Sequence, residues 1–218
     1  MLTVHTAGSL LPGGGSPAVP GGAVAVRGRE IAAVGPYETV LAAHPDARVR
    51  RWPGTITPGL VHPYGVWLLE HAYHPDPREA DALGSAPLTG AALTALGPDD
   101  ARWGGSARRG AQRLLAHGVT VLAGTPVRPS VADAIARTGL TVLPTVAVPG
   151  GGAVPEPGAV PGYGAPEESY AAVLDDPRTA GTRAVGTRAV GVRADFAVFE
   201  AGECVATVLA GRLVHRRR

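Results

Sequence analysis

Residues 119–146 read VTVLAGTPVRPSVADAIARTGLTVLPTV, and this stretch decides the fold class. Val119–Ala123 is a short apolar run rich in β-branched residues, which is typical of a buried strand. Ser130 is a candidate N-cap with an acidic residue three positions later, and Gly139 is placed to end the helix. Leu140–Val146 is a second apolar run. A strand, a helix and a strand punctuated by glycines predict a βαβ unit with parallel strands.

A further helix is predicted directly before this unit. Gln112–Ala116 lies in an amphipathic pattern that we expect to begin near Ser106, and Gly118 is placed to end it. The helix would therefore lead straight into the first buried strand.

The first 58 residues show a different pattern, with short β-rich runs separated by glycine and proline. Ala23–Val26 and Ile31–Val34 flank the sequence Arg-Gly-Arg-Glu, in which Gly28 can supply the positive φ that a hairpin turn needs. Tyr37–Ala43 is expected to form a short helix, and Arg48–Trp52 is expected to form another strand.

The C-terminal part returns to β-structure. Phe196–Glu200, Val205–Leu209 and Arg212–His215 are predicted strands, separated by turns at Ala201-Gly202 and Ala210-Gly211. Before them, residues 148–166 are mostly Gly, Pro and Ala, so we expect a flexible linker there. The five-residue repeat that begins at 181 is too short for a solenoid and indicates local duplication in a loop.

The composition limits the function classes. Hydrophobic residues make up 45% of the 218 residues and charged residues 17%, which favours a chain that buries a core over a disordered one. We find no apolar run long enough to span a membrane and no secretory signal pattern, and the single Cys204 suits a reducing cytoplasm. The net charge is only +2 and the aromatic residues are scattered, so no nucleic-acid partner is expected.

Two pairs of sequence stretches carry a family resemblance. The first pair is GAVAVRGREIAAVG at 22–35 and TPGLV at 57–61, and the second is VGVRADFAVF at 190–199 and VLAGRLV at 208–214. Together they resemble the metal-dependent amidohydrolases, in particular the imidazolonepropionase-like and aminodeoxyfutalosine deaminase-like branch. The resemblance implies a small β domain built from both ends of the chain around a (β/α)₈ barrel.

The expected metal ligands of that family are missing from this sequence. In the family, the strand after Pro-Gly-Leu-Val carries a His-x-His pair, because residues i and i+2 of a strand can bind one ion. The resemblance places that pair on Tyr64 and Val66, which are not suitable ligands. In addition, only about 120 residues separate Pro58 from Gly181, too few for a closed barrel. The later strands, with further His ligands and the catalytic Asp, have no visible counterpart.

We therefore predict a mixed α/β fold in four parts. Residues 1–57 and 186–218 would form a small β-sandwich composite domain. Residues 58–147 would form a truncated (β/α) barrel remnant with a few parallel strands. Residues 148–166 would be the linker, and 167–185 would be a short helix and a connection.

His62, His71 and His74, together with Glu70, are the remaining candidates for metal binding. If their segment were helical, His71 and His74 would share one face, and histidines with a carboxylate can bind Zn²⁺. Prolines on both sides of the cluster argue against a long helix and favour histidines without a metal.

Three other side chains have structural interpretations. His117 precedes the helix-ending glycine, where a cation interacts favourably with the helix dipole. Cys204 is expected to be a buried, inert thiol, and Asp195 a carboxylate that caps a turn or loop.

Two functional hypotheses follow. The first is a non-catalytic relative of the amidohydrolases that needs no cofactor, acts by binding or assembly, and has its open sheet covered by a second copy or a protein partner. The second is an active hydrolase of a non-peptide C–N bond in a small cyclic amide or amidine. It would use Zn²⁺ on a relocated site of His62, His71 and His74 to activate a water. Either could take a small-molecule ligand, and no catalytic residue is assigned.

Overall fold

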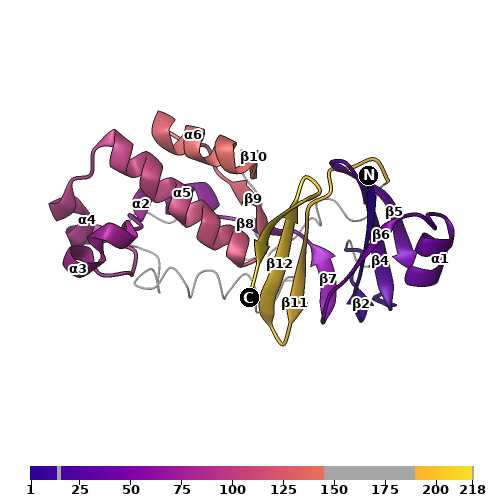
Figure 1. Ribbon diagram of the computed structural model, residues 1–218. Helices are drawn as coiled ribbons and strands as arrows, with labels where there is room; N and C mark the ends of the chain where they lie inside the picture. Colours follow the sequence, from indigo (N-terminus) through magenta and orange to yellow (C-terminus); the bar gives the residue numbers. More distant parts are fainter. Residues whose placement is uncertain (14–15, 145–189, 218) are drawn as a thin grey trace. The chain divides into compact units, whose positions relative to one another are not determined.

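A computed structural model describes residues 1–13, 16–144 and 190–217 (Figure 1). The strands are β1 (Leu2–Thr6), β2 (Ser9–Leu10), β3 (Val19–Pro20), β4 (Gly22–Arg27), β5 (Glu30–Pro36), β6 (Arg48–Arg51), β7 (Thr55–Pro58), β8 (Leu60–His62), β9 (Val119–Ala123), β10 (Thr141–Leu143), β11 (Phe196–Glu200), β12 (Glu203–Leu209) and β13 (Arg212–Arg216). The helices are α1 (Tyr37–Ala42), α2 (Gly65–His71), the 3₁₀-helix η1 (Pro77–Glu79), α3 (Ala80–Leu83), α4 (Gly90–Leu96), α5 (Asp100–Ala116) and α6 (Pro129–Thr138).

The chain divides into two compact units. The first comprises Met1–Leu60, Leu115–Thr120 and the described part of the C-terminal segment. The second comprises Val61–Leu114 and the described residues from Val121 to Pro144.

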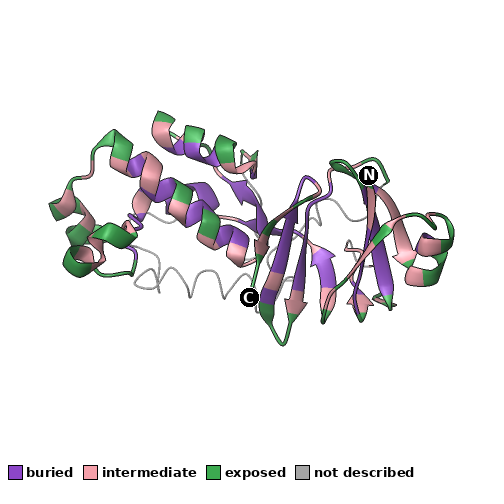
Figure 2. Cartoon of the chain, viewed as in Figure 1, coloured by how far each residue is buried: buried purple, intermediate pink, exposed green. Residues whose placement is uncertain are grey.

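The first unit is a β-sandwich. One sheet has the order β5-β4-β1-β6, and the other has the order β13-β12-β11-β7-β2-β3. Strand β4 shows why the two sheets pack, since its side chains alternate between two faces. Val24 and Val26 join the core between the sheets, whereas Ala23 and Ala25 pack with Val40 of α1 on the opposite face. The sandwich core contains Leu10, Val24, Val26, Ile31, Ile56, Phe196, Val198, Ala206 and Val208, which come from both sheets (Figure 2).

The two ends of the chain build this sandwich together. Strand β11 pairs antiparallel with β7 on one side, where Phe196 lies opposite Pro58, and with β12 on the other. The predicted N-terminal hairpin is confirmed, because β4 and β5 pair antiparallel around a turn in which Gly28 has a φ of +63°. The mixed α/β fold with a composite β part is therefore confirmed.

The second unit contains the predicted βαβ unit. Its sheet has the order β10-β9-β8, and β10 pairs parallel with β9, with α6 as the connection between them. Gly139 ends α6 in the left-handed conformation, as expected. Helix α5 has one buried face, which carries Trp103, Ala107, Ala111 and Leu114, while its opposite face is exposed (Figure 2).

Two predicted helix starts were wrong. Helix α5 begins at Asp100 and not near Ser106, because the Asp99 carboxylate accepts a hydrogen bond from the Arg102 N–H at 2.8 Å and so caps the first turn. Ser130 is not the N-cap of α6. That helix begins at Pro129, with Arg128 as its N-cap, and the Ser130 hydroxyl instead donates to Asp100 Oδ1 at 2.7 Å.

Some predictions lie outside the described residues. These are the linker at 148–166, the helix and connection at 167–185, most of the five-residue repeat, and the end of the strand predicted for residues 140–146. None of the helices in the described ranges is both long and apolar enough to cross a membrane.

Candidate functional site

The first half of the family's metal site does not lie on a strand in this chain. Strand β8 ends at His62, and α2 begins only three residues later at Gly65. Tyr64 is the N-cap of that helix, with φ −118° and ψ 24°, and Val66 is in its first turn. The alternation of a strand therefore cannot present positions 64 and 66 to one ion.

The space beside Val66 is filled by apolar contacts. The Val66 side chain is 1% exposed, and it lies so close to Gly124 that a Cβ built there would come within 2.9 Å of Val66 Cβ. The space around Gly65 is also filled, since a Cβ built at this position would lie 2.6 Å from Leu122 Cδ2. A metal ion needs lone-pair donors at about 2.0–2.3 Å, and these residues offer hydrocarbon. The residues present do not fit the metal that the family implies.

His62 holds the turn between β8 and α2. Its ring is buried, and Nδ1 accepts a hydrogen bond from the Tyr64 N–H at 3.2 Å. Burial lowers the pKa of His62 to about 4, so the imidazole is neutral at pH 7. A neutral ring with one nitrogen accepting from the backbone has a structural role in this turn.

His71 and His74 do not share a helix face. His71 is the last residue of α2, where its Nδ1 lies 2.9 Å from the Trp67 carbonyl oxygen and its ring stacks on the Trp67 ring. The chain then becomes extended at Ala72, so His74 lies outside the helix.

His74 packs beneath α5. Its side chain is 1% exposed, and its backbone N–H donates to Ser106 Oγ at 2.8 Å. Neither ring nitrogen makes a hydrogen bond of good geometry with the residues that the structure describes. Burial, together with the positive charges of Arg113 and Arg109, lowers the pKa of His74 to about 4.

The structure does not bring His62, His71 and His74 together. Within residues 1–13, 16–144 and 190–217, no three His, Cys, Asp or Glu side chains are grouped so that they could hold a metal ion. His62, His71 and His74 are instead used separately, for a turn, a helix end and a packed interior position.

Glu70 has a role that sequence reasoning missed. Its carboxylate is buried, and Oε1 accepts hydrogen bonds from the Val127 N–H at 2.6 Å and the Arg128 N–H at 2.8 Å. The Arg128 guanidinium lies over the Trp103 ring and donates to the Glu70 carbonyl oxygen. Glu70 therefore fixes the loop between β9 and α6. No local sequence signal links positions so far apart in the chain.

We predict that Glu70→Gln destabilises the second unit by about 1–3 kcal/mol, because a neutral amide accepts these two buried N–H groups more weakly than a carboxylate does. Urea unfolding followed by circular dichroism measures the loss. The exposed Asp81, in the first turn of α3, provides the control variant Asp81→Asn. An equal effect of the two substitutions would contradict the role assigned to Glu70.

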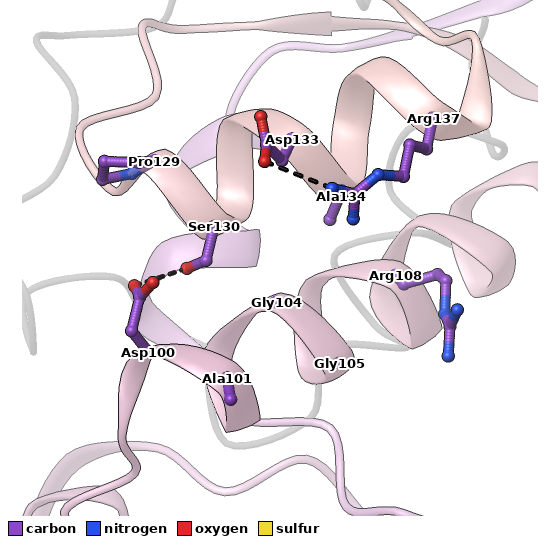
Figure 3. A pocket seen from close by; sticks show the side chains of 10 residues that line it. All are labelled: Asp100, Ala101, Gly104, Gly105, Arg108, Pro129, Ser130, Asp133, Ala134 and Arg137. Atoms are coloured by element: carbon purple, nitrogen blue, oxygen red, sulfur yellow. Dashed lines mark hydrogen bonds and ion pairs between the residues drawn. The ribbon is translucent and has the colours of Figure 1, made fainter.

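A hollow of about 420 Å³ lies between α5 and α6 (Figure 3). The helices pack closely here, since a Cβ built at Gly104 would lie 3.4 Å from Ser130 Cβ, which is an ordinary contact distance. Two interactions lie along the hollow, the ion pair of Asp133 with Arg137 at 3.2 Å and the hydrogen bond that Ser130 donates to Asp100 at 2.7 Å. This hollow therefore presents a polar surface between helices.

The other candidates of the sequence have structural roles. The buried Asp195 carboxylate accepts from the Ala210 N–H at 2.6 Å and pairs with Arg193, so it caps a turn as expected. Burial raises the pKa of the Cys204 thiol, which suits an inert side chain. His117 lies between the end of α5 and Gly118, which has a φ of +83°.

The N-terminal hairpin lies in a segment that matches a known protein-family model. Residues 22–47, which include β4, β5 and α1, match the imidazolonepropionase-like composite domain of bacteria. This segment of the chain is similar to that domain. The resemblance expected from residues 22–35 is therefore confirmed, and the matched strands are those that close the sandwich core.

Three solved enzyme structures are also similar to part of this chain. Aspergillus niger ochratoxinase is 23% identical over 66% of this chain, with a TM-score of 0.42. Helicobacter pylori aminofutalosine deaminase is 12% identical over 65%, with a TM-score of 0.43, and E. coli guanine deaminase is 19% identical over 65%, with a TM-score of 0.41. The aligned parts cover 30%, 32% and 35% of those three proteins, so the chain spans about a third of their length. No curated protein sequence matches the chain.

Proposed function

We propose that this chain is a non-catalytic relative of the imidazolonepropionase-like amidohydrolases that acts by binding and self-association in the cytoplasm. The observation that carries the proposal is the packing at Val66. Val66 stands at one of the two positions where the family binds its metal. It is buried, it packs against Gly124, and it lies on a helix and not on a strand.

The histidines of the chain do not support the alternative, a hydrolase with a relocated metal site. His71 is stacked on Trp67, and His74 lies beyond the end of α2 against α5. Among the residues that the structure describes, no three His, Cys, Asp or Glu side chains are grouped so that they could hold a metal ion. No step of a metal-dependent hydrolysis can be assigned to these positions.

Self-association is proposed from the edge of the second unit's sheet. Strand β10 has β9 as its neighbour on one side only, within the part of the chain that the structure describes. Strands of parallel sheets are usually buried on both faces, yet β10 has no buried residue and Val142 is 37% exposed. A second copy that pairs with this edge would cover it.

The metal part of the proposal predicts a protein without stoichiometric zinc. Protein purified without a metal-affinity tag is analysed by mass spectrometry for zinc, iron and manganese, and its melting temperature is compared with and without a chelator. We expect far less than one metal per chain and no shift on chelation, since a ligand that binds the native state would raise the melting temperature. Stoichiometric metal whose removal lowers the melting temperature would contradict the proposal.

The assembly part predicts a homodimer at micromolar concentration, measured by size-exclusion chromatography with light scattering. Val142→Lys on β10 is expected to shift the mass to the monomer, because it places a charge on the edge. Val214→Lys is the matched control, since Val214 is 40% exposed on β13 of the other unit. A monomeric parent protein, or equal effects of the two variants, would refute pairing through β10.

A further inference from the structure

The β-sandwich unit has a cleft that is separate from the family's metal positions. It has a volume of about 570 Å³, and the residues around it come from the ends of β6, β12 and β13 and from the turn between β11 and β12. Its polar and aromatic lining consists of Arg51, Trp52, Glu200, Glu203, Arg216 and Arg217. Pockets that bind small molecules have volumes of about 300–1,000 Å³, so the size is suitable for a ligand.

The indole of Trp52 is fixed at the wall of this cleft. Its Nε1–H donates to His5 Nδ1 at 3.0 Å, and its backbone N–H donates to the Thr6 carbonyl oxygen at 2.8 Å. Two guanidinium groups lie over the ring, that of Arg50 at 5.5 Å and that of Arg216 at 6.0 Å from its centroid. The indole therefore holds two cations in place beside the cleft.

Arg51 is positioned in the same way by a different ring. Its guanidinium lies 5.2 Å from the centroid of the Tyr37 ring, and Nη2 donates to the Tyr37 hydroxyl at 3.3 Å. The contacts of Arg50, Arg51 and Arg216 are thus with aromatic groups, and none of the three forms an ion pair within the described ranges. Their charges remain available to an anion.

The carboxylates of the cleft limit the size of that anion. Glu203 forms an ion pair with Arg217, and Glu200 lies on the same rim. A polyanion that follows the surface would meet both glutamates, whereas a small anion can contact the arginines alone. Arg51 and Arg216 both line the cleft, so an anion bound there is attracted by two positive charges.

We propose that this cleft binds a small organic anion, with a phosphate monoester or carboxylate group held by Arg51 and Arg216. The planar guanidinium group suits both anions, because it can donate two parallel hydrogen bonds to their oxygens. Trp52 keeps Arg216 in position, and Tyr37 does the same for Arg51. The two arginines are far apart in the sequence, so the site exists only where β6 and β13 are brought together.

The test uses the whole chain labelled with ¹⁵N and follows the indole N–H signal of Trp52, which is assigned with Trp52→Phe. Adenosine monophosphate, inorganic phosphate and citrate are the anionic probes, and adenosine is the uncharged control. We expect a saturable shift with adenosine monophosphate or citrate and no shift with adenosine. The two organic probes distinguish a phosphate from a carboxylate ligand.

The double variant Arg51→Gln/Arg216→Gln is expected to weaken binding at least tenfold, while Arg212→Gln leaves it unchanged. Arg212 is an exposed arginine of the same strand β13 that does not line the cleft. Circular dichroism checks that each variant is folded. The proposal is overturned if no anion shifts the Trp52 signal, or if Arg212→Gln weakens binding as much as the double variant. Tighter, strongly salt-dependent binding of a single-stranded oligonucleotide would also overturn it, in favour of a nucleic-acid partner.

Discussion

Acidification from pH 6.5 to pH 4 is expected to lower the free energy of unfolding by several kcal/mol. His5, His62 and His74 are buried, and the pKa of each is lowered to about 4, mainly by burial. In this pH range the unfolded chain binds protons at these positions and the folded chain does not. The stabilisation is therefore fully present above pH 6.5 and is lost as the pH falls, by up to about 3 kcal/mol for each histidine.

Asp195 acts in the opposite direction. Burial is the largest influence on its carboxyl group and raises its pKa, so its contribution to stability decreases as the pH rises through the folded-state pKa. The three histidines are expected to dominate because their shifts add. The loss on acidification should still be smaller than the sum of the three individual values.

Urea unfolding at pH 7, 6, 5 and 4 measures this dependence. His74→Leu is expected to reduce the slope, because it removes a buried titrating group whose ring nitrogens make no hydrogen bond of good geometry with the residues that the structure describes. His44→Gln, at a partly exposed position after α1, is the control and should leave the slope nearly unchanged. A free energy of unfolding that stays constant between pH 6.5 and 4 would show that these rings are protonated in the folded protein.

Gly54→Ala is expected to destabilise the β-sandwich by about 2–5 kcal/mol. Gly54 has a φ of +67°, and an added Cβ would collide with the carbonyl oxygen of Phe199 on β11. Two costs add at this position, the strain of a left-handed backbone and the displacement of a paired strand. Thermal or urea unfolding measures the combined loss.

Gly28 separates these two costs. It has nearly the same φ, +63°, but no atom lies within 4 Å of a Cβ built at this position. Gly28→Ala is therefore expected to cost only the backbone strain, about 1–2 kcal/mol. Equal effects of the two substitutions would show that the collision of the added methyl group with Phe199 costs no stability, which would contradict the prediction.

Elements whose signals are local could be predicted from the sequence. The strand Val119–Ala123 was predicted with its observed bounds, and Gly139 ends α6 where expected. Both signals are local, because an apolar run and a glycine in the left-handed conformation each depend on only a few neighbouring residues. The start of α5 could not be predicted in this way. Two adjacent glycines weaken the helical pattern, and the cap at Asp99 outweighs them.

For the candidate site, the sequence could predict which residue types are present but not how they are arranged in space. The sequence showed that Tyr64 and Val66 are unsuitable as metal ligands, but the short helix after β8 and the contact of Val66 with Gly124 depend on neighbouring elements. The histidines at 71 and 74 looked adjacent because three residues span nearly one helical turn. The helix ends between them, so they face different surroundings.

The sequence by itself determined the parallel βαβ unit, the composite β-sandwich with its hairpin, and the loss of the paired histidines. The βαβ unit and the hairpin follow from periodicity and turn glycines, whereas the composite sandwich and the absence of the histidine pair follow from the family resemblance of the two ends of the chain. Only the tertiary structure decided that Glu70 fixes the loop at Arg128, that His74 is buried beneath α5, and that Arg51 and Arg216 border one cleft. The physical reason is that these interactions join residues far apart in the chain, and strand pairing and helix packing bring them together.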